Sequence, residues 1–212
     1  MKSVLISIQP KWCDLIANGK KTVEVRKTKP KLETPFKVYI YCTQGDALAV
    51  PCLNAPKYTI HRMNNGTSNG RQLTAKEREK SDYSFANGKV IGEFVCDKIE
   101  NIEIRHFTVF GHENLYTAVG ENPDNQWLKH SCLSYDEVAK YGKHAPLYGW
   151  HISDLVIYDK PKELSEFQQC HKCKHNCART SQNVELCKYH RLTRPPQSWC
   201  YVEMIGGGEN DL

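Results

Sequence analysis

GKKTVEVR, residues 19–26, is the stretch of sequence that decides the fold. Its second half alternates like a β-strand, which places Glu24 and Arg26 on the same face. Lys21 is three positions before Glu24, so a regular strand would direct it to the opposite face. A site shared by Lys21, Glu24 and Arg26 therefore requires Lys21 to lie in the turn after Gly19, or a β-bulge to redirect it.

Regular elements are predicted on both sides of this stretch. Ser3–Ile8 is rich in Val, Leu and Ile and predicts a strand, and Pro10 suits the first turn of a following helix. Gly19 is placed to cap that helix. Residues 36–42 (FKVYIYC) predict a third strand, because β-branched and aromatic residues are enriched there.

The second half of the chain predicts further strands and one capped helix. Strands are expected at 89–97, at 99–105 and, as a last strong strand, at 148–158. Ser134 and Glu137 match a capping box for a helix over 135–141, which Gly142 would close. The order of elements predicts an α+β fold with a small, curled, mostly antiparallel sheet or β-barrel and short flanking helices.

Residues 45–88 interrupt the pattern of strands. They contain Asn-Gly pairs and a charged run at 76–80, which are typical of turns and loops. We interpret them as a long polar excursion with at most one short helix near 75–80. The expected organisation is a domain over 1–158 that contains this excursion, a Cys-rich basic tail over 159–205 and a disordered end over 206–212.

The residues 19–26 fit the pattern G-x-K-x-x-E-x-R, which resembles the signature of the ASCH family, relatives of the RNA-binding PUA domains. The strand and helix before it, and the strand around Trp150, also resemble this family over about residues 4–158. The resemblance implies a PUA-like β-barrel with a polar cleft that binds RNA or modified nucleotides. The tail is loosely similar to those of ASCH proteins from phages and Firmicutes.

One branch of the family removes the acetyl group of N4-acetylcytidine, and there the motif lysine is catalytic. The resemblance assigns that role to Lys21, and in a hydrolase of this kind we expect Glu24 to shuttle protons beside it. However, the branch has threonine where this chain has Glu24, and a second glutamate comes from later in the chain. Three residues are candidates for that second glutamate: Glu100, Glu103 and Glu113.

The chemistry of the motif residues supports several roles. Arg26 can hold Glu24 ionised or bind a phosphate or carbonyl oxygen with its planar fork. Lys21 is a point charge for an anion or, if desolvated, a base or nucleophile. Glu24 can accept hydrogen bonds from the amino group of a base. The alternative is a solvated surface ion pair, which contributes little.

Residues outside the motif add candidate contacts to the cleft. Aromatic rings that could stack on a base belong to Trp12 and Trp150, with His151 beside the latter. Ser7 and Gln9 could reach the same cleft from the first strand. The alternative for the aromatic residues is a place in the hydrophobic core.

The tail holds a cluster of cysteines: Cys170, Cys173, Cys177, Cys187 and Cys200. We expect four of these five to bind a structural zinc ion, because a short polar segment rarely folds without such a link. An iron–sulfur cluster is a less favoured alternative, and free thiols packed on the domain are another. Trp199 and Tyr201 would dock the tail on the domain or anchor a protein partner.

Composition sets the remaining bounds. The chain has 212 residues, is 40% hydrophobic and 25% charged, and carries a formal charge of +5, which permits but does not require an anionic partner. No apolar run reaches the ~20 residues of a membrane span. With no signal-peptide pattern, we expect a cytoplasmic protein whose cysteines are not a disulfide framework. Three functions remain open: nucleotide or RNA binding, an amidohydrolase, and a protein-interaction module that uses the tail.

Overall fold

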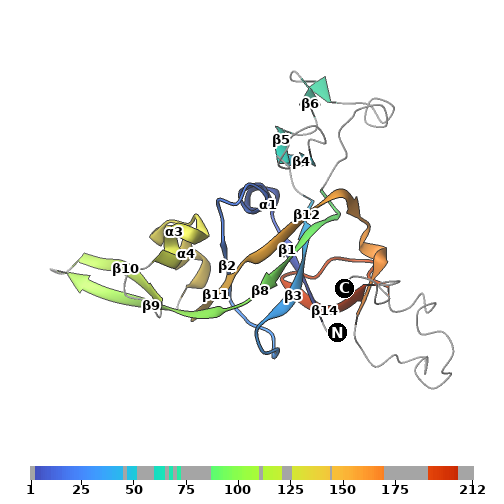
Figure 1. Cartoon of the computed structure of the whole chain (residues 1–212). Coiled ribbons are helices and arrows are strands. Elements are labelled where there is room, and N and C mark those ends of the chain that lie inside the picture. The colour runs from blue at the N-terminus through green and yellow to red at the C-terminus, as the bar shows by residue number, and fades with distance from the viewer. Residues whose placement is uncertain are drawn as a thin grey trace. The chain divides into compact units, whose positions relative to one another are not determined.

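The structure is a computed structural model (Figure 1) that describes residues 3–44, 47–51, 60–64, 67–68, 71–72, 87–109, 112–120, 126–143, 145–169 and 191–204. This part of the chain is mostly β, with few and short helices. It divides into two compact units. The first comprises Met1–Asp14, Lys37–Glu93 and Val156–Leu212, and the second comprises Leu15–Phe36 and Phe94–Leu155.

The first unit is built on a six-stranded sheet with the order β12-β8-β3-β1-β14-β13. Its strands are β1 (Ser3–Ile8), β3 (Phe36–Cys42), β8 (Val90–Cys96), β12 (Ser153–Lys162), β13 (Phe167–Gln169) and β14 (Trp199–Met204). Every residue of β1 is buried, and β1 pairs on one edge with β3, to which it is parallel, and on the other with the antiparallel β14. The short helix η1 (Leu164–Glu166) connects β12 to β13.

The two ends of the predicted tail belong to this sheet. β14 pairs with β1, and Phe167 of β13 packs its ring 4.8 Å from that of Tyr39 on β3. A cluster of buried side chains forms around them: Leu5, Tyr39, Tyr41, Val90, Phe167, Leu192 and Val202. Parts of the chain nearly 200 residues apart therefore share one core.

Two small hairpins lie within the segment that the sequence predicts as a loop. β4 (Ala47–Pro51) pairs with β5 (Ile60–Asn64), and β6 (Thr67–Ser68) pairs with β7 (Arg71–Gln72). Ser68 is opposite Arg71, as the Asn-Gly turn signal between them predicts. The interpretation as a polar loop was too simple, because these strands pair locally with each other. The short helix expected near 75–80 falls outside the described residues.

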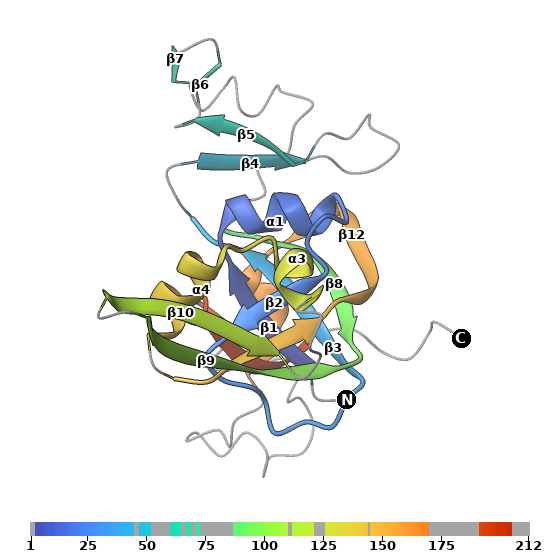
Figure 2. The ribbon, with the colours of Figure 1, turned by 90° about the vertical axis from the view of Figure 1, so that its left-hand side faces the viewer.

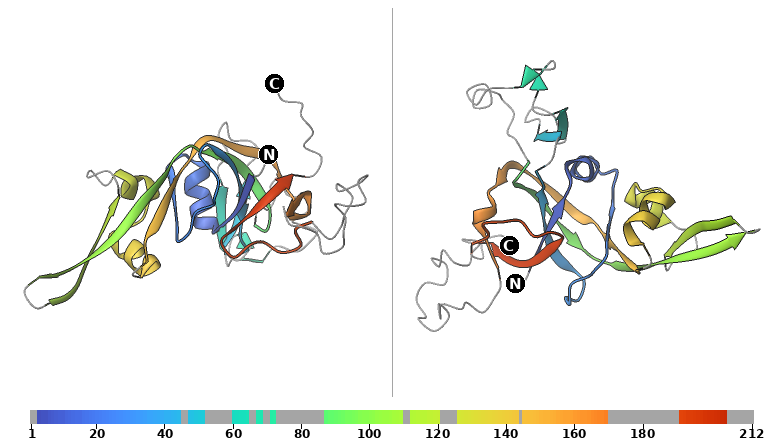
Figure 3. Two further views of the ribbon diagram at one scale, coloured as in Figure 1. Left: turned by 90° about the horizontal axis from the view of Figure 1, so that it is seen from below. Right: turned by 180° about the vertical axis from the view of Figure 1, so that it is seen from behind.

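The second unit contains an antiparallel four-stranded sheet with the order β10-β9-β11-β2. Its strands are β2 (Val23–Arg26), β9 (Ile99–Val109), β10 (His112–Gly120) and β11 (Leu147–His151). Figure 2 shows helices α3 (Gln126–Ser131) and α4 (Tyr135–Gly142) beside these strands. The core is made by six buried side chains: Val23, Val25, Ile102, Trp127, Val138 and Leu147. β9 and β10 form a long hairpin (Figure 3).

The predicted barrel is corrected to two open sheets. A closed barrel needs its first and last strands to pair, but each of these two described sheets ends in edge strands that pair on one side only: β12 and β13 in one, β10 and β2 in the other. The single strand expected over 148–158 is also wrong. It is divided at Ile152 into β11 and β12, which belong to different sheets. Asp154, just beyond the break, has a φ of 46°, a conformation outside the extended range.

The predicted helix signals are confirmed, with one change. α1 (Pro10–Ala17) begins at Pro10 and is followed by Gly19 with φ +68°. Ser134 and Glu137 form the expected capping box of α4. Gly142, however, is the last helical residue, and Lys143 after it has the positive φ of 53°. A Cβ on Gly142 would lie 2.1 Å from Ile104 Cδ1, so an alanine there would require the end of that side chain to shift.

No helix in the described ranges is both long and apolar enough to span a membrane.

Candidate functional site

Lys21 lies outside the alternation of β2. The main-chain N–H groups of Lys20 and Lys21 both donate to the carbonyl of Leu15, at 2.9 and 3.0 Å, as the chain leaves α1 through the left-handed Gly19. The strand begins only at Val23. Lys21 therefore lies in the turn before β2, as a site shared with Glu24 and Arg26 requires. The alternation of side chains along β2 does not fix the direction of its side chain.

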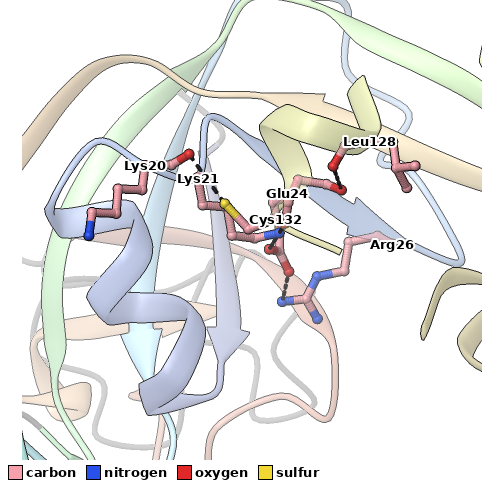
Figure 4. Close-up of polar contacts among 7 residues, drawn as sticks. Lys20, Lys21, Glu24, Arg26, Leu128 and Cys132 are labelled. Carbon is pink, nitrogen blue, oxygen red and sulfur yellow. Dashed lines mark hydrogen bonds and ion pairs between the residues drawn. The ribbon is translucent and has the colours of Figure 1, made fainter. Parts of the chain in front are cut away.

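The side chains of Lys21, Glu24 and Arg26 form a buried ionic cluster, which we call the trio (Figure 4). Lys21 Nζ lies 3.3 Å from Glu24 Oε2, and Arg26 Nη2 lies 3.0 Å from Glu24 Oε1. Each carboxylate oxygen therefore faces one cation. All three residues are at most 7% exposed, which is rare for charged side chains unless they are paired.

The C-terminal end of α3 completes the surroundings of Lys21. Lys21 Nζ donates to the carbonyl of Ser131 at 2.7 Å, and the N–H of Thr22 donates to the carbonyl of His130 at 2.9 Å. Cys132 Sγ lies 3.3 Å from the carbonyl of Lys20. Carbonyl groups at a helix C-terminus carry partial negative charge and favour a cation. The end of α3 therefore holds the start of β2 and its lysine in place.

The trio carries two positive charges and one negative charge in a site with little solvent. Removing charges from water costs several kcal/mol per ion unless other charges and hydrogen bonds compensate. The short contacts to Glu24 and Ser131 supply part of this compensation. An added anion or carbonyl oxygen would meet a field that is net positive.

Tyr141 on α4 is a neighbour of the trio that the sequence did not reveal. Burial raises the pKa of its hydroxyl, the positive charge of Arg26 opposes this shift, and the negative charge of Glu24 adds to it. The hydroxyl also hydrogen-bonds to the main chain of Lys27. Tyr141 is 38% exposed. The sequence predicts only that Tyr141 is the last residue of a helix, and no local signal connects it to β2.

Trp150 and His151 lie on β11, directly beside β2. Trp150 is opposite Glu24 in the strand register, is fully buried, and packs edge-on against Phe36 with ring centroids 5.9 Å apart. Its ring is a core aromatic in this structure. The side chain of His151 is 30% exposed, and its Nε2 lies 3.3 Å from Oε2 of the buried Glu100.

The three candidate glutamates differ in position. Glu100 is buried against His151, whereas the side chain of Glu103 is 68% exposed and faces Arg105 at 3.4 Å. The side chain of Glu113 is not among those that the structure describes. Of the two described candidates, only Glu100 is buried within the second unit.

The predicted contacts Ser7, Gln9 and Trp12 belong to the first unit, whereas the trio belongs to the second. The hydroxyl of Ser7 donates to the carbonyl of Pro196 at 2.6 Å, which ties β1 to the tail. Gln9 is exposed, and Trp12 is half-buried with Lys11 Nζ 4.2 Å from its ring centroid.

Most of the predicted metal site lies outside the described residues, which exclude Cys170, Cys173, Cys177 and Cys187. Cys200 is described. It is half-buried on β14 opposite Leu5. Burial raises the pKa of its thiol, and a hydrogen bond with Gln169 opposes this rise. Within the described ranges, no three His, Cys, Asp or Glu side chains are grouped to hold a metal ion. Trp199 and Tyr201 flank Cys200 in the sequence of β14, and their ring centroids lie 5.4 Å apart.

One family model matches most of this chain. The family described as "ASCH domain" matches residues 6–191. The crystal structure of ASCH from Zymomonas mobilis is similar with 15% identity and a TM-score of 0.47, over 95% of this chain and 87% of that chain. A serine-to-alanine variant of that protein is similar with 15% identity and a TM-score of 0.49, over 95% and 88%. No curated protein matches this chain.

Proposed function

Because the chain belongs to the ASCH domain family, we propose that it binds RNA or a modified nucleotide and that the trio of Lys21, Glu24 and Arg26 contacts the ligand. The observation that carries this proposal is the trio itself. Two cations flank one carboxylate at 3.3 and 3.0 Å, and all three are nearly buried.

The trio offers complementary groups to a nucleotide. The guanidinium of Arg26 and the ammonium of Lys21 can donate to phosphate or carbonyl oxygens, with charge-assisted hydrogen bonds roughly twice as strong as neutral ones. Glu24 accepts from an exocyclic amino group, as glutamate does from cytosine. A nucleobase that carries both a carbonyl and an amino group matches this mixed set of donors and acceptor.

Affinity measurements on point variants test the proposal. Lys21→Ala and Arg26→Ala should each weaken RNA binding about tenfold or more in a gel-shift assay, since a hydrogen bond to a charged group contributes ~1.5–3 kcal/mol. Lys20→Ala is the matched control. Lys20 has the same charge, is exposed, and its side chain points away from the trio in Figure 4. Circular dichroism confirms that each variant is folded.

Unchanged affinity in both Lys21→Ala and Arg26→Ala would remove the trio from the binding site. Equal losses in Lys20→Ala and Lys21→Ala would show that only general positive charge matters.

The alternative function, cleavage of an amide on an acylated nucleoside, fits the geometry less well. Lys21 Nζ donates to a main-chain carbonyl at 2.7 Å and faces a carboxylate at 3.3 Å. Both contacts suit an ammonium group, whereas a nucleophile or general base needs a neutral amine with an accessible lone pair. Hydrolysis would require both contacts to rearrange when the substrate binds.

Incubation with N4-acetylcytidine decides between the two functions. Release of cytidine by the unmodified protein, lost in Lys21→Ala and kept in Lys20→Ala, would establish the hydrolase. Binding of the nucleoside without its conversion at high protein concentration is the result that a binding module predicts.

A further inference from the structure

Two lysines and two tyrosines form a second surface in the same unit as the trio. Lys27 Nζ lies 4.9 Å from the ring centroid of Tyr141, and Lys29 Nζ lies 5.2 Å from that of Tyr148. Both lysines are exposed, Tyr141 is 38% exposed and Tyr148 is half-buried. We call these four residues the basic-aromatic strip.

The strip adjoins the trio through the strand pairing of β2 and β11. Tyr148 is directly opposite Arg26 in the register of these strands, and Lys27 follows Arg26 in the chain. Tyr141 joins them from α4, where its hydroxyl bonds to the main chain of Lys27 and lies in the field of Arg26 and Glu24. The trio and the strip therefore form a continuous set of groups.

The charge of the surroundings favours an anionic partner. Lys140 is in the last turn of α4 beside Tyr141, whereas Asp136 and Glu137 are in the first turn, at the opposite end of the helix. Proteins that bind single strands of nucleic acid combine cations that follow the phosphates with aromatic rings that stack on the bases. The two lysines and two tyrosines of the strip supply both.

We propose that the basic-aromatic strip binds the nucleotides that flank the one held by the trio, so that the ligand is a single strand of nucleic acid and not an isolated nucleotide. The proposal rests on the proposed function of the trio. Tyr141 and Tyr148 stack on bases, and Lys27 and Lys29 leave the tyrosine rings to pair with the adjacent phosphates. Such binding tolerates sequence changes and depends strongly on salt.

The test compares a short strand with a mononucleotide. Fluorescence anisotropy with labelled oligocytidylate of about eight nucleotides gives the affinity for a strand at several salt concentrations, and calorimetry with cytidine monophosphate gives the affinity for one nucleotide. Oligodeoxycytidylate distinguishes DNA from RNA. The variants are the Lys27→Ala, Lys29→Ala double variant and single Tyr141→Ala and Tyr148→Ala variants. Lys98→Ala, an exposed lysine of the same unit, is the charge control.

The strip predicts a specific pattern. Each tyrosine variant binds the oligonucleotide about tenfold more weakly, since stacking on an aromatic side chain is lost. The double lysine variant lowers the slope of log K against log salt by about 1.4, from ~0.7 for each phosphate contact in a single strand. Affinity for the mononucleotide stays unchanged in the double lysine variant and in Tyr148→Ala, and Tyr148→Phe, which keeps the ring, retains full affinity for the strand.

The other outcomes separate the strip from the trio. Strip variants that bind the oligonucleotide with the affinity and salt slope of the unmodified protein overturn the strip and leave the trio intact. Loss in the strip variants, together with full binding by Lys21→Ala, overturns the trio as a contact while the strip stands. An unmodified protein that binds neither strand nor mononucleotide overturns both.

Discussion

The ammonium nitrogen of Lys21 lies 2.7 Å from the main-chain oxygen of Ser131, a residue 110 positions further along the chain. This contact connects the turn before β2 to the C-terminal end of α3 and directs Lys21 towards Glu24. Both of these partners of Lys21 belong to the second unit, so the geometry of the trio is set within that unit.

Loss of Lys21 should destabilise the protein, whereas loss of its neighbour should not. Lys21→Met leaves the buried carbonyl of Ser131 without this donor, which costs ~1–3 kcal/mol in the free energy of unfolding. Lys20→Met removes an exposed lysine and should stay within ~0.5 kcal/mol of the unmodified protein. Urea denaturation measures both values. Equal stability of the two variants would contradict the buried contact.

Glu24→Gln should be more destabilising than Lys21→Met. It leaves two buried cations without their shared carboxylate, and breaking a buried ion pair from one side costs about 3 kcal/mol or more. Phosphate should partly restore the Tm of Glu24→Gln if an anion can bind beside Lys21 and Arg26. The same phosphate concentration on Lys20→Met gives the general effect of the salt. No extra rise for Glu24→Gln would mean that the trio does not admit an anion.

The stability of the folded protein should fall at alkaline pH because the thiol of Cys96 is buried. Burial raises its pKa from 9.0 to about 12, and the charge of Asp97 adds to the shift. Between these values the unfolded thiol loses its proton while the folded thiol keeps it. Stability therefore falls as pH rises, by about 1.4 kcal/mol per pH unit for this group. Tyr39 and Tyr158, whose pKa values are also raised by burial, act in the same direction.

Denaturation of the unmodified protein and of Cys96→Ala across this pH range isolates the contribution of the thiol. The variant should start less stable and lose stability less steeply. Parallel curves for the two proteins would show that Cys96 ionises as readily in the folded state.

Two glycines should differ in their tolerance of alanine. A Cβ on Gly92 would lie 2.3 Å from the main-chain oxygen of Val156, which cannot move without displacing β12. A Cβ on Gly149 would meet the side chains of Val23 and Ile102 at 3.1 and 3.3 Å, which can shift slightly. Gly92→Ala should cost ~1–3 kcal/mol or more and Gly149→Ala less. Thermal unfolding of both variants gives the order, and the reverse order would contradict it.

The metal site of the tail stays a prediction with a direct measurement. Purified protein should contain about one equivalent of zinc, since structural sites bind tightly. We propose that Cys200, which lies on β14 opposite Leu5, is the cysteine that the set of four can spare. Elemental analysis should therefore find zinc retained in Cys200→Ser and lost in Cys173→Ser. Protein without zinc or iron would exclude the site.

Local signals in the sequence predicted much of this protein. Ser134 and Glu137 predicted the cap of α4, and Gly19 predicted the end of α1. The spacing of Lys21, Glu24 and Arg26 indicated that a site shared by all three requires Lys21 to leave the alternation of the strand. Each of these depends on residues within a few positions of one another, where backbone preferences and side-chain spacing act directly.

Contacts between distant segments were decided only by the tertiary structure. The trio meets Ser131 because α3 packs beside β2, and it has Tyr141 as a neighbour because α4 brings that residue to the main chain of Lys27; no pattern within 19–26 encodes this packing. Whether a sheet closes depends on which distant strands become neighbours. In the two described sheets, the edge strands do not pair with each other. The motif GKKTVEVR thus determined its own turn and strand, whereas its buried surroundings, on which its charges depend, were set by residues more than 100 positions away.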